Sequence, residues 1–463
     1  MKSVILMLLA AATSTAAAQP ARPAPSPAPA PPPATPAAPG GPSPTAPTTS
    51  AGPEVLTLER AVEIAMRQQP SLRQSKAQLE ATQGRVDLSR VARNPTVQLG
   101  ATVGTGSTRS AATGTGTGGG NDFFSHSEDT GLSASASWRI YDFGQTAANI
   151  RAAELNADAA AAAVSTTTLD VRTGVENAYL EAVARRRLVQ FAEATVKSED
   201  AHLDQARRFV AAQAKDPIEV AQAQARDANA KSALAQAQSN EAIALANLRS
   251  AIGWVDPANS PTVSTNWPTP SESDPPGLAA LVEAARKNRP EIVQLDKQIE
   301  AADASLTAAH AERRPILSAT ARTDWTPGTG NWSPEPSWSA GLTLSWNLFD
   351  GGRASADVRI ARANVQSAMA QRDTLLVSLT SQLDSARSQI VANHANVQAS
   401  TEAVTAARAQ LQLAEARYTQ GLGSQIELAD AQTAVTTAQG NLVQAEFQLA
   451  TAWALLHRAT AQP

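Results

Sequence analysis

The 463-residue sequence offers few side chains that could carry out covalent or metal chemistry. It contains no cysteine, and its five histidines are scattered without the H-E-x-x-H spacing of a zinc site. The glycine-rich run TGTGTGGGN lacks the Lys-Ser/Thr pair of a phosphate loop, and no serine stands in a nucleophile elbow. We therefore expect a protein that is not an enzyme, with no catalytic residue, no cofactor and no metal.

Two carboxylates near the C-terminus have a spacing that suits an ion gate. Glu427 and Asp430 stand three positions apart and would share one face of a helix. Multiplied by rotational symmetry, they would form a ring that attracts cations and repels itself as it narrows. The alternative is structural: Ser424 with Glu427 fits a capping box, as does Asp216 with Glu219, and Asp430 is then an ordinary solvated residue.

Long helices must position these carboxylates. Apolar residues recur at alternating intervals of three and four, which is typical of a coiled-coil seam. The same seam occurs twice, 208 positions apart: Val175, Ala178, Ala182, Val189, Val196, Leu203, Ala206 and Val210 match Leu383, Ala386, Ile390, Val397, Val404, Leu411, Ala414 and Tyr418. Each seam lies in a long stretch free of proline, so each stretch predicts a helix of roughly 100 Å.

Four segments alternate with period two instead, which indicates strands. Each has about 9–11 residues, the length that crosses the hydrocarbon core of a membrane when tilted. Trp138, Trp325, Trp338 and Trp346 lie in or beside these segments, as expected of anchors at a membrane interface. Four strands cannot close a barrel, since small barrels need about eight, so closure requires several chains.

The chain is therefore expected to consist of an N-terminal leader followed by two internal repeats. We expect a signal peptide at 1–18 and a Pro/Ala-rich tether at 19–53. The first repeat, 54–277, is expected to hold a helix at 57–94, strands at 96–104 and 132–141, and helices at 144–213 and 217–252. The second, 278–463, is expected to hold a helix at 278–313, strands at 316–323 and 338–348, and helices at 352–420 and 424–459. A net charge of -4 gives no support for a nucleic-acid partner.

The order of these motifs resembles the TolC-type outer-membrane efflux family. The resemblance covers about 55–460 and rests on LTLERAVEIAMRQQPSLRQSKAQLE, the duplicated SWRIYDFG and SWNLFDGG, and ARYTQGLGSQIELADAQ. It implies a mainly α fold with membrane β-strands: a homotrimer whose four strands per protomer form one 12-stranded outer-membrane barrel above an α-barrel of long helices. It also implies a periplasmic adaptor and an inner-membrane transporter as partners, with no nucleic acid, and a large periplasmic portion.

The resemblance also assigns roles to single residues. Asp430 and Glu427 match acidic positions that line the periplasmic aperture, and Tyr418 matches a tyrosine that holds neighbouring helices closed, although it also fits the packing seam. Gly421, Leu422 and Gly423 form the turn where the family docks its adaptor, or simply a helix cap. The family often has a basic residue where Gly423 stands, so Lys215 or Arg417 would have to supply a closing salt bridge.

These inferences lead to two hypotheses. The first is a passive, gated outer-membrane conduit for efflux or type I secretion. The second is a soluble periplasmic coiled-coil scaffold or adaptor, in which the alternating strands form a sheet with one buried face. The two differ in whether the apolar face of the strands is covered by protein or is free to meet lipid.

Overall fold

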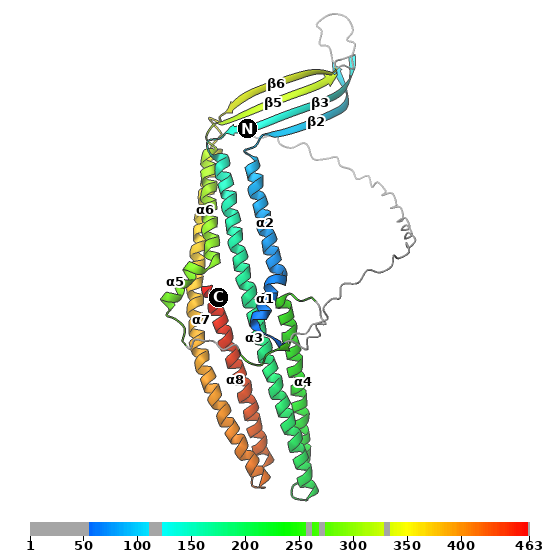
Figure 1. Cartoon of the computed structure of the whole chain (residues 1–463), viewed down its shortest axis with the longest axis vertical. Coiled ribbons are helices and arrows are strands. Elements are labelled where there is room, and N and C mark those ends of the chain that lie inside the picture. Colours follow the sequence, from blue (N-terminus) through cyan, green and yellow to red (C-terminus); the bar gives the residue numbers. More distant parts are fainter. Residues whose placement is uncertain (1–54, 111–122, 256–261, 268–273, 328–333, 462–463) are drawn as a thin grey trace, which may run out of the picture. The chain divides into compact units, whose positions relative to one another are not determined.

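The computed structural model describes residues 55–110, 123–255, 262–267, 274–327 and 334–461 (Figure 1). The expected signal peptide and tether lie outside the described residues, as does the glycine-rich run. By its contacts the chain divides into Met1–Gly52 and Pro53–Pro463, and the fold described below belongs to the second unit.

Helices make up most of the described chain, and two series of four follow one another. The first series is α1 (Leu58–Gln68), α2 (Pro70–Val91), α3 (Gln145–Ala211) and α4 (Ile218–Ile252). The second is α5 (Leu278–Asn288), α6 (Pro290–Ala311), α7 (Arg353–Thr419) and α8 (Gln425–Thr460). Within the described residues, no helix is both long and apolar enough to span a membrane.

The single helices expected at 57–94 and 278–313 are each divided into two. The breaks fall at Gln69 and Arg289, whose ψ angles of 122° and 119° are extended rather than helical. The cause is the next residue, because Pro70 and Pro290 disfavour helical geometry in the residue before them and begin the following helix. The four helices expected further along the chain differ from α3, α4, α7 and α8 by at most two residues at either end.

The strands differ more from the expected ranges. β2 (Thr96–Ser110) and β3 (Phe123–Tyr141) form one long hairpin, whereas 96–104 and 132–141 were expected. β5 (Ile316–Pro327) is longer than 316–323, and β6 (Pro334–Ser345) replaces 338–348. β6 ends at Ser345 because that residue pairs with Ile316, the first residue of β5, and no partner strand continues beyond it.

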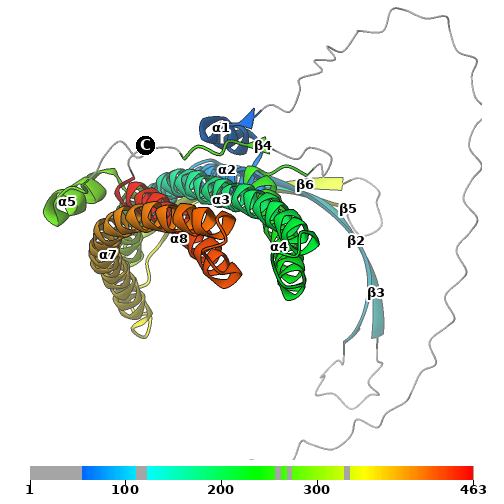
Figure 2. The same cartoon turned by 90° about the horizontal axis from the view of Figure 1, so that it is seen from below.

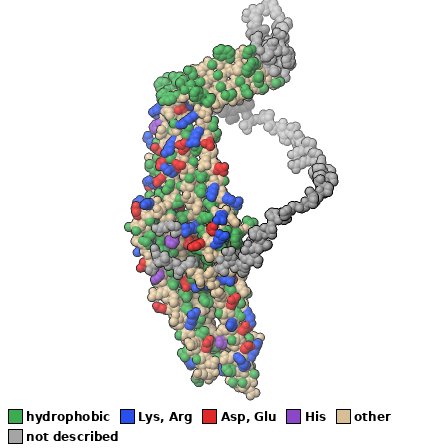
Figure 3. Space-filling model, in the orientation of Figure 1, with side chains coloured by type: hydrophobic (Ala, Val, Ile, Leu, Met, Phe, Trp, Pro, Cys, Tyr) green, Lys and Arg blue, Asp and Glu red, His purple; other side chains and the backbone are tan. Residues whose placement is uncertain are grey.

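The four long strands form one antiparallel sheet in the order β2-β3-β5-β6. Its two outer strands, β2 and β6, are edges in the single chain. One face is apolar and solvent-exposed, with Val97, Leu99, Trp338, Leu342 and Leu344 on it. Figure 3 shows hydrophobic side chains gathered on the strands and most charged side chains over the helices. A small parallel pair, β1 (Val55–Leu56) and β4 (Thr262–Val263), lies apart from this sheet.

The helices pack side by side rather than around a central core. α3 contacts α4 and α8, and α8 contacts α7, so that the four form a curved row (Figure 2). Most seam residues are buried between neighbouring helices, as for Val175 and Ala182 in α3 and Leu383 and Ile390 in α7. Equivalent apolar clusters thus hold each repeat, one with α1 and one with α5.

Candidate functional site

Two helix turns form one end of the helical part, between α3 and α4 and between α7 and α8 (Figure 1). Tyr418, at the end of α7, connects them because its hydroxyl donates a hydrogen bond to Glu219 Oε2 at 3.1 Å. Its ring is buried and contacts the Phe209 ring edge to face, with centroids 5.9 Å apart. The tyrosine therefore both packs in the seam and joins the two repeats.

Glu219 is the centre of a small polar network. Its Oε1 lies 3.2 Å from Lys215 Nζ, which also lies 5.2 Å from the centroid of the Tyr418 ring. Its backbone carbonyl accepts a hydrogen bond of 3.1 Å from the buried amide of Gln425. Burial, together with the negative charge and hydrogen bond of Glu219, raises the pKa of Tyr418 to about 12, so the phenol stays protonated and can donate.

The capping box expected at Asp216 and Glu219 is wrong. Pro217 occupies the N-cap of α4, with no side-chain cap, and the Glu219 N–H binds the Asp216 backbone carbonyl at 3.1 Å. Proline can hold this position because the first helical N–H groups have no partner within the helix. The Glu219 carboxylate is thereby free to bind Lys215 and Tyr418.

The capping box at the start of α8 is half present. Ser424 Oγ accepts a hydrogen bond of 3.1 Å from the Glu427 N–H, as the sequence predicts. The Glu427 carboxylate does not reach back to Ser424 but accepts a hydrogen bond of 2.9 Å from Arg417 in α7. Arg417 thus supplies a basic partner within the turn, and Lys215 supplies one to Glu219.

Asp430 has a different environment from Tyr418. It is exposed, and its carboxylate has no hydrogen bond or ion pair to any residue that the structure describes. Leu428 and Ala431 bury the opposite side of α8. The structure therefore brings Tyr418 to Glu219 and leaves Asp430 as an unpaired charge on the surface of the helix.

The α7–α8 turn is shaped by two glycines. Gly421 has a φ of +75°, a left-handed conformation that suits glycine. A Cβ on Gly423 would lie 3.1 Å from both Arg417 Cβ and the Tyr418 N atom, so a side chain there would be crowded and its neighbours would have to move by a few tenths of an ångström. Between them, Leu422 is 71% exposed and lies near the exposed Ile426, so the turn presents apolar side chains outward.

At the ends of α3 and α7 that lie next to the sheet, an aspartate precedes each helix. Asp142 follows β3, and Asp350 stands four residues after Trp346. Asp142 accepts hydrogen bonds from the N–H groups of Gly144 and Thr146, at 3.2 and 2.8 Å. Asp350 accepts equivalent bonds from Gly352 and Ala354, both at 2.8 Å. These hydrogen bonds give partners to backbone N–H groups that have none within the first turn of each helix. The same arrangement occurs in both copies of the duplicated motif.

Two of the four tryptophans lie where the strands meet the helices, and the other two lie toward the far end of β5 and β6. Trp138 and Trp346 occupy equivalent places, because their ring N–H groups donate to the Arg93 and Arg313 carbonyls at 2.9 and 3.1 Å. Trp338 is 81% exposed on β6, and Trp325 is half-buried on β5. Trp138 and Trp346 thus combine an exposed apolar ring with a polar contact to the chain that precedes the first strand of each repeat.

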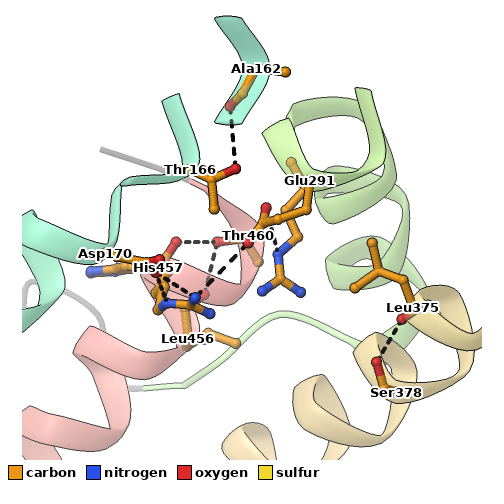
Figure 4. Close-up of polar contacts among 11 residues, drawn as sticks. Ala162, Thr166, Asp170, Glu291, Leu375, Ser378, Leu456, His457 and Thr460 are labelled. Atoms are coloured by element: carbon orange, nitrogen blue, oxygen red, sulfur yellow. Dashed lines mark hydrogen bonds and ion pairs between the residues drawn. The ribbon is translucent and has the colours of Figure 1, made fainter. Parts of the chain in front are cut away.

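A partly exposed charge cluster that the sequence does not predict joins α3, α6 and α8 (Figure 4). Arg458 Nε donates to Asp170 at 2.9 Å, and Arg458 Nη2 lies 3.9 Å from Glu291. Glu291 in turn lies 3.3 Å from Arg289, whose pKa burial lowers. Arg289 is almost fully buried at the break between α5 and α6. The sequence feature that could have indicated this cluster is an arginine directly before the proline that begins α6.

Comparisons with known proteins agree with this architecture. The family described as "outer membrane efflux protein" matches residues 61–254 and 281–462. Protein CyaE of Bordetella pertussis is 30% identical over 405 residues, which cover 86% of this chain and 82% of CyaE.

Two solved structures are similar in fold. The outer membrane protein VceC of Vibrio cholerae has a TM-score of 0.69 at 20% identity, with 87% of this chain and 95% of that chain covered. The CmeC outer membrane channel of Campylobacter jejuni has a TM-score of 0.74 at 15% identity, with 87% and 85% covered. At these identities the likeness concerns the fold alone.

Proposed function

Because the chain belongs to the outer membrane efflux protein family, we propose that it is the trimeric channel of a tripartite efflux or type I secretion system. It is an outer-membrane protein with a large helical periplasmic portion. In the proposed role it is a passive conduit: a periplasmic adaptor and an inner-membrane transporter supply the cargo and the energy. The absence of any clustered catalytic side chains in the sequence supports a passive role.

The observation that carries this proposal is the pair of unpaired sheet edges. β2 and β6 run antiparallel to each other because three antiparallel pairings separate them. The β6 edge of one copy can therefore pair with the β2 edge of the next in an all-antiparallel ring, as in outer-membrane barrels. The occupant of each edge is thus a second copy of this chain.

Three copies suit a channel better than two. Two copies would give a barrel of about eight strands, whose interior side chains fill the space, whereas about twelve strands leave an opening. The exposed apolar face of the sheet then meets lipid. This exposure argues against the soluble scaffold, which would need protein packed over Leu99, Leu342 and Leu344.

The turn end of the helices is the proposed periplasmic gate. Tyr418 and Glu219 hold the α7–α8 pair against the α3–α4 pair, which corresponds to a closed state. Three copies of Glu427 and Asp430 would line the aperture. The outward Leu422 and Ile426 give a partner an apolar contact at the turn, where we place adaptor docking.

Disulfide crosslinking tests ring closure directly, because the natural chain has no cysteine. A cysteine at Leu99 in β2 would be combined in turn with one at Ala340, Leu342 or Leu344 in β6. We expect at least one pair to give covalent dimers and trimers after oxidation in cells. Each cysteine alone, and Ala134→Cys in the inner strand β3 combined with Leu342→Cys, are the controls.

Monomers from all three pairs, together with release of the protein in a periplasmic wash, would contradict the channel and support the scaffold. Trimers from at least one pair, retained in the outer-membrane fraction, would support the channel. Planar bilayer recordings of the uncrosslinked protein should then show conductance through the assembled ring.

A further inference from the structure

A basic pocket lies directly below the first strand–helix crossing. It has a volume of about 600 Å³, and Arg90, Arg93, Asn94, Arg151 and Glu154 line it. The first two arginines come from the last turn of α2 and the residues after it, whereas Arg151 and Glu154 come from the second and third turns of α3. The helix pair therefore gathers three guanidinium groups around one cavity.

Among the residues that the structure describes, two of these guanidinium groups have no protein partner. Arg90 is neutralised, since its Nη2 lies 2.8 Å from Glu154 Oε1 and its Nη1 lies 3.5 Å from Asp87. The side chains of Arg93 and Arg151 make no hydrogen bond or ion pair within the described part of the chain. A planar guanidinium is well matched to a phosphate, to which it donates two parallel hydrogen bonds.

A separate apolar groove lies on the sheet. It has a volume of about 530 Å³ and is lined mainly by small side chains, Ala136, Ala319, Ala321 and Ala340, with Leu342 beside them. Pro95 and Trp138 also line it. The groove therefore runs along the apolar face of β3, β5 and β6.

Trp138 joins the pocket to the groove. Its ring lines the groove, and its Nε1–H donates to the Arg93 backbone carbonyl at 2.9 Å. Pro95, also in the groove, directly follows Asn94 of the pocket. A bound molecule with an anionic head and an apolar tail would place its head among the arginines and its tail along the alanines.

We propose that this composite site binds one phospholipid of the periplasmic leaflet, with its anionic phosphate between Arg93 and Arg151 and an acyl chain in the groove. The proposal rests on the outer-membrane placement of the sheet given above. Charge complementarity selects the phosphate, and the apolar groove connected to it through Trp138 selects a lipid over free phosphate. The lipid would link the sheet to α2 and α3 at the membrane boundary.

Native mass spectrometry of the detergent-purified trimer with added phosphatidylglycerol tests the proposal. For the double variant Arg93→Gln/Arg151→Gln we expect retention of the lipid to fall about tenfold, because two charge-assisted phosphate contacts are lost. Arg73→Gln is the matched control, since Arg73 is an exposed arginine on α2. It lies roughly 30 Å from Arg93 along the helix axis. It should retain lipid like the natural protein.

Two further experiments distinguish binding of the lipid phosphate from binding of the acyl chain. Ala321→Phe fills the groove and leaves the arginines in place, and it should weaken lipid retention by several-fold. Inorganic phosphate added at the lipid concentration should not displace the lipid. Displacement by phosphate alone, or full retention by Ala321→Phe, would overturn the lipid as the ligand.

Equal retention by the double arginine variant and the natural protein would overturn the site itself. The single variant Arg151→Gln, on an exposed helix surface, keeps the test valid if the double variant folds poorly. Trimer formation and conductance are measured on the same samples, so a loss of lipid binding in an intact channel concerns this site alone. A monomeric sample would instead contradict the proposed function.

Discussion

At the scale of single residues, the hydroxyl of Tyr418 joins groups that stand 199 positions apart in the chain. The sequence predicts that this tyrosine holds helices together, but it gives no sign that Glu219 is its partner. The spacing around Glu219 fits a capping box equally well, and only the side-chain contact between α4 and α7 distinguishes the two roles. Contacts between distant elements of this kind have no local pattern.

Replacing Tyr418 by Phe should loosen the closed gate. The variant keeps the ring contact with Phe209 and loses only the bond to Glu219, which contributes about 1 kcal/mol. We expect a higher mean conductance in planar bilayers. Phe209→Leu keeps the hydroxyl and should conduct like the natural protein, and unchanged conductance of Tyr418→Phe would show that the bond does not restrain opening.

Asp142 makes the strand–helix crossing sensitive to acid. Burial raises its pKa, but hydrogen bonds from Thr146 and Gly144 and the nearby Arg139 outweigh this, so the folded pKa lies below the ordinary value. The ionised carboxylate therefore adds stability that is complete above about pH 4 and is lost as the pH falls through the folded pKa.

Thermal unfolding followed by circular dichroism tests this dependence. At neutral pH, Asp142→Ala should lose about 1 kcal/mol, as expected for a helix cap. As the pH falls below about 4, the natural protein should lose stability toward that of the variant, so the difference between them narrows. A difference that stays constant down to the lowest pH would exclude the carboxylate as its source.

At the scale of elements, the period of apolar residues predicts the helices, and proline explains where the prediction fails. Pro70 and Pro290 each stand inside a continuous helical pattern, so the pattern alone joins the two helices. The ends of β2 and β3 were missed for another reason. Their outer parts, rich in Gly, Ser and Thr, lack the alternation that identifies a strand, and the hairpin ladder extends through them.

Glycine at the start of α7 is required by backbone geometry. Gly352 has a φ of +92°, where a side chain costs about 1–2 kcal/mol. We therefore expect Gly352→Ala to lower the melting temperature. Gly84, in the middle of α2 with open space around it, is the control, and Gly84→Ala should be neutral or stabilising by about 0.5–1 kcal/mol. Equal effects at the two positions would contradict the geometric explanation.

At the scale of the whole molecule, the part of a single chain that the structure describes has two sheet edges without a partner strand. The duplication visible in the sequence predicts two equivalent sectors. Among the described residues, the structure leaves β2 and β6 unpaired at the sheet edges and the exposed Asp430 unpaired beside the α7–α8 turn. The number of chains in the ring depends on curvature and strand tilt, which no residue pattern specifies. In the proposed ring, Asp430 would have a role that it lacks in one chain.

In a ring of three, Glu427 and Asp430 would place up to six carboxylates around the aperture. Glu427 is already bound to Arg417, so the unpaired Asp430 should contribute most to the field that attracts cations. We therefore expect Asp430→Ala to weaken block by divalent cations in planar bilayers several-fold. Glu402→Gln, an exposed carboxylate on α7 above the turn, should leave block unchanged.

The two variants distinguish a ring from general surface charge. Both remove one negative charge per chain, but only Asp430 lies beside the turn where three copies would converge. A similar loss of block in both would attribute the effect to net charge, and unchanged block in Asp430→Ala would remove this residue from the gate. Because symmetry multiplies each charge by three, a local effect should exceed that of one isolated carboxylate, and its dependence on ionic strength should be correspondingly steep.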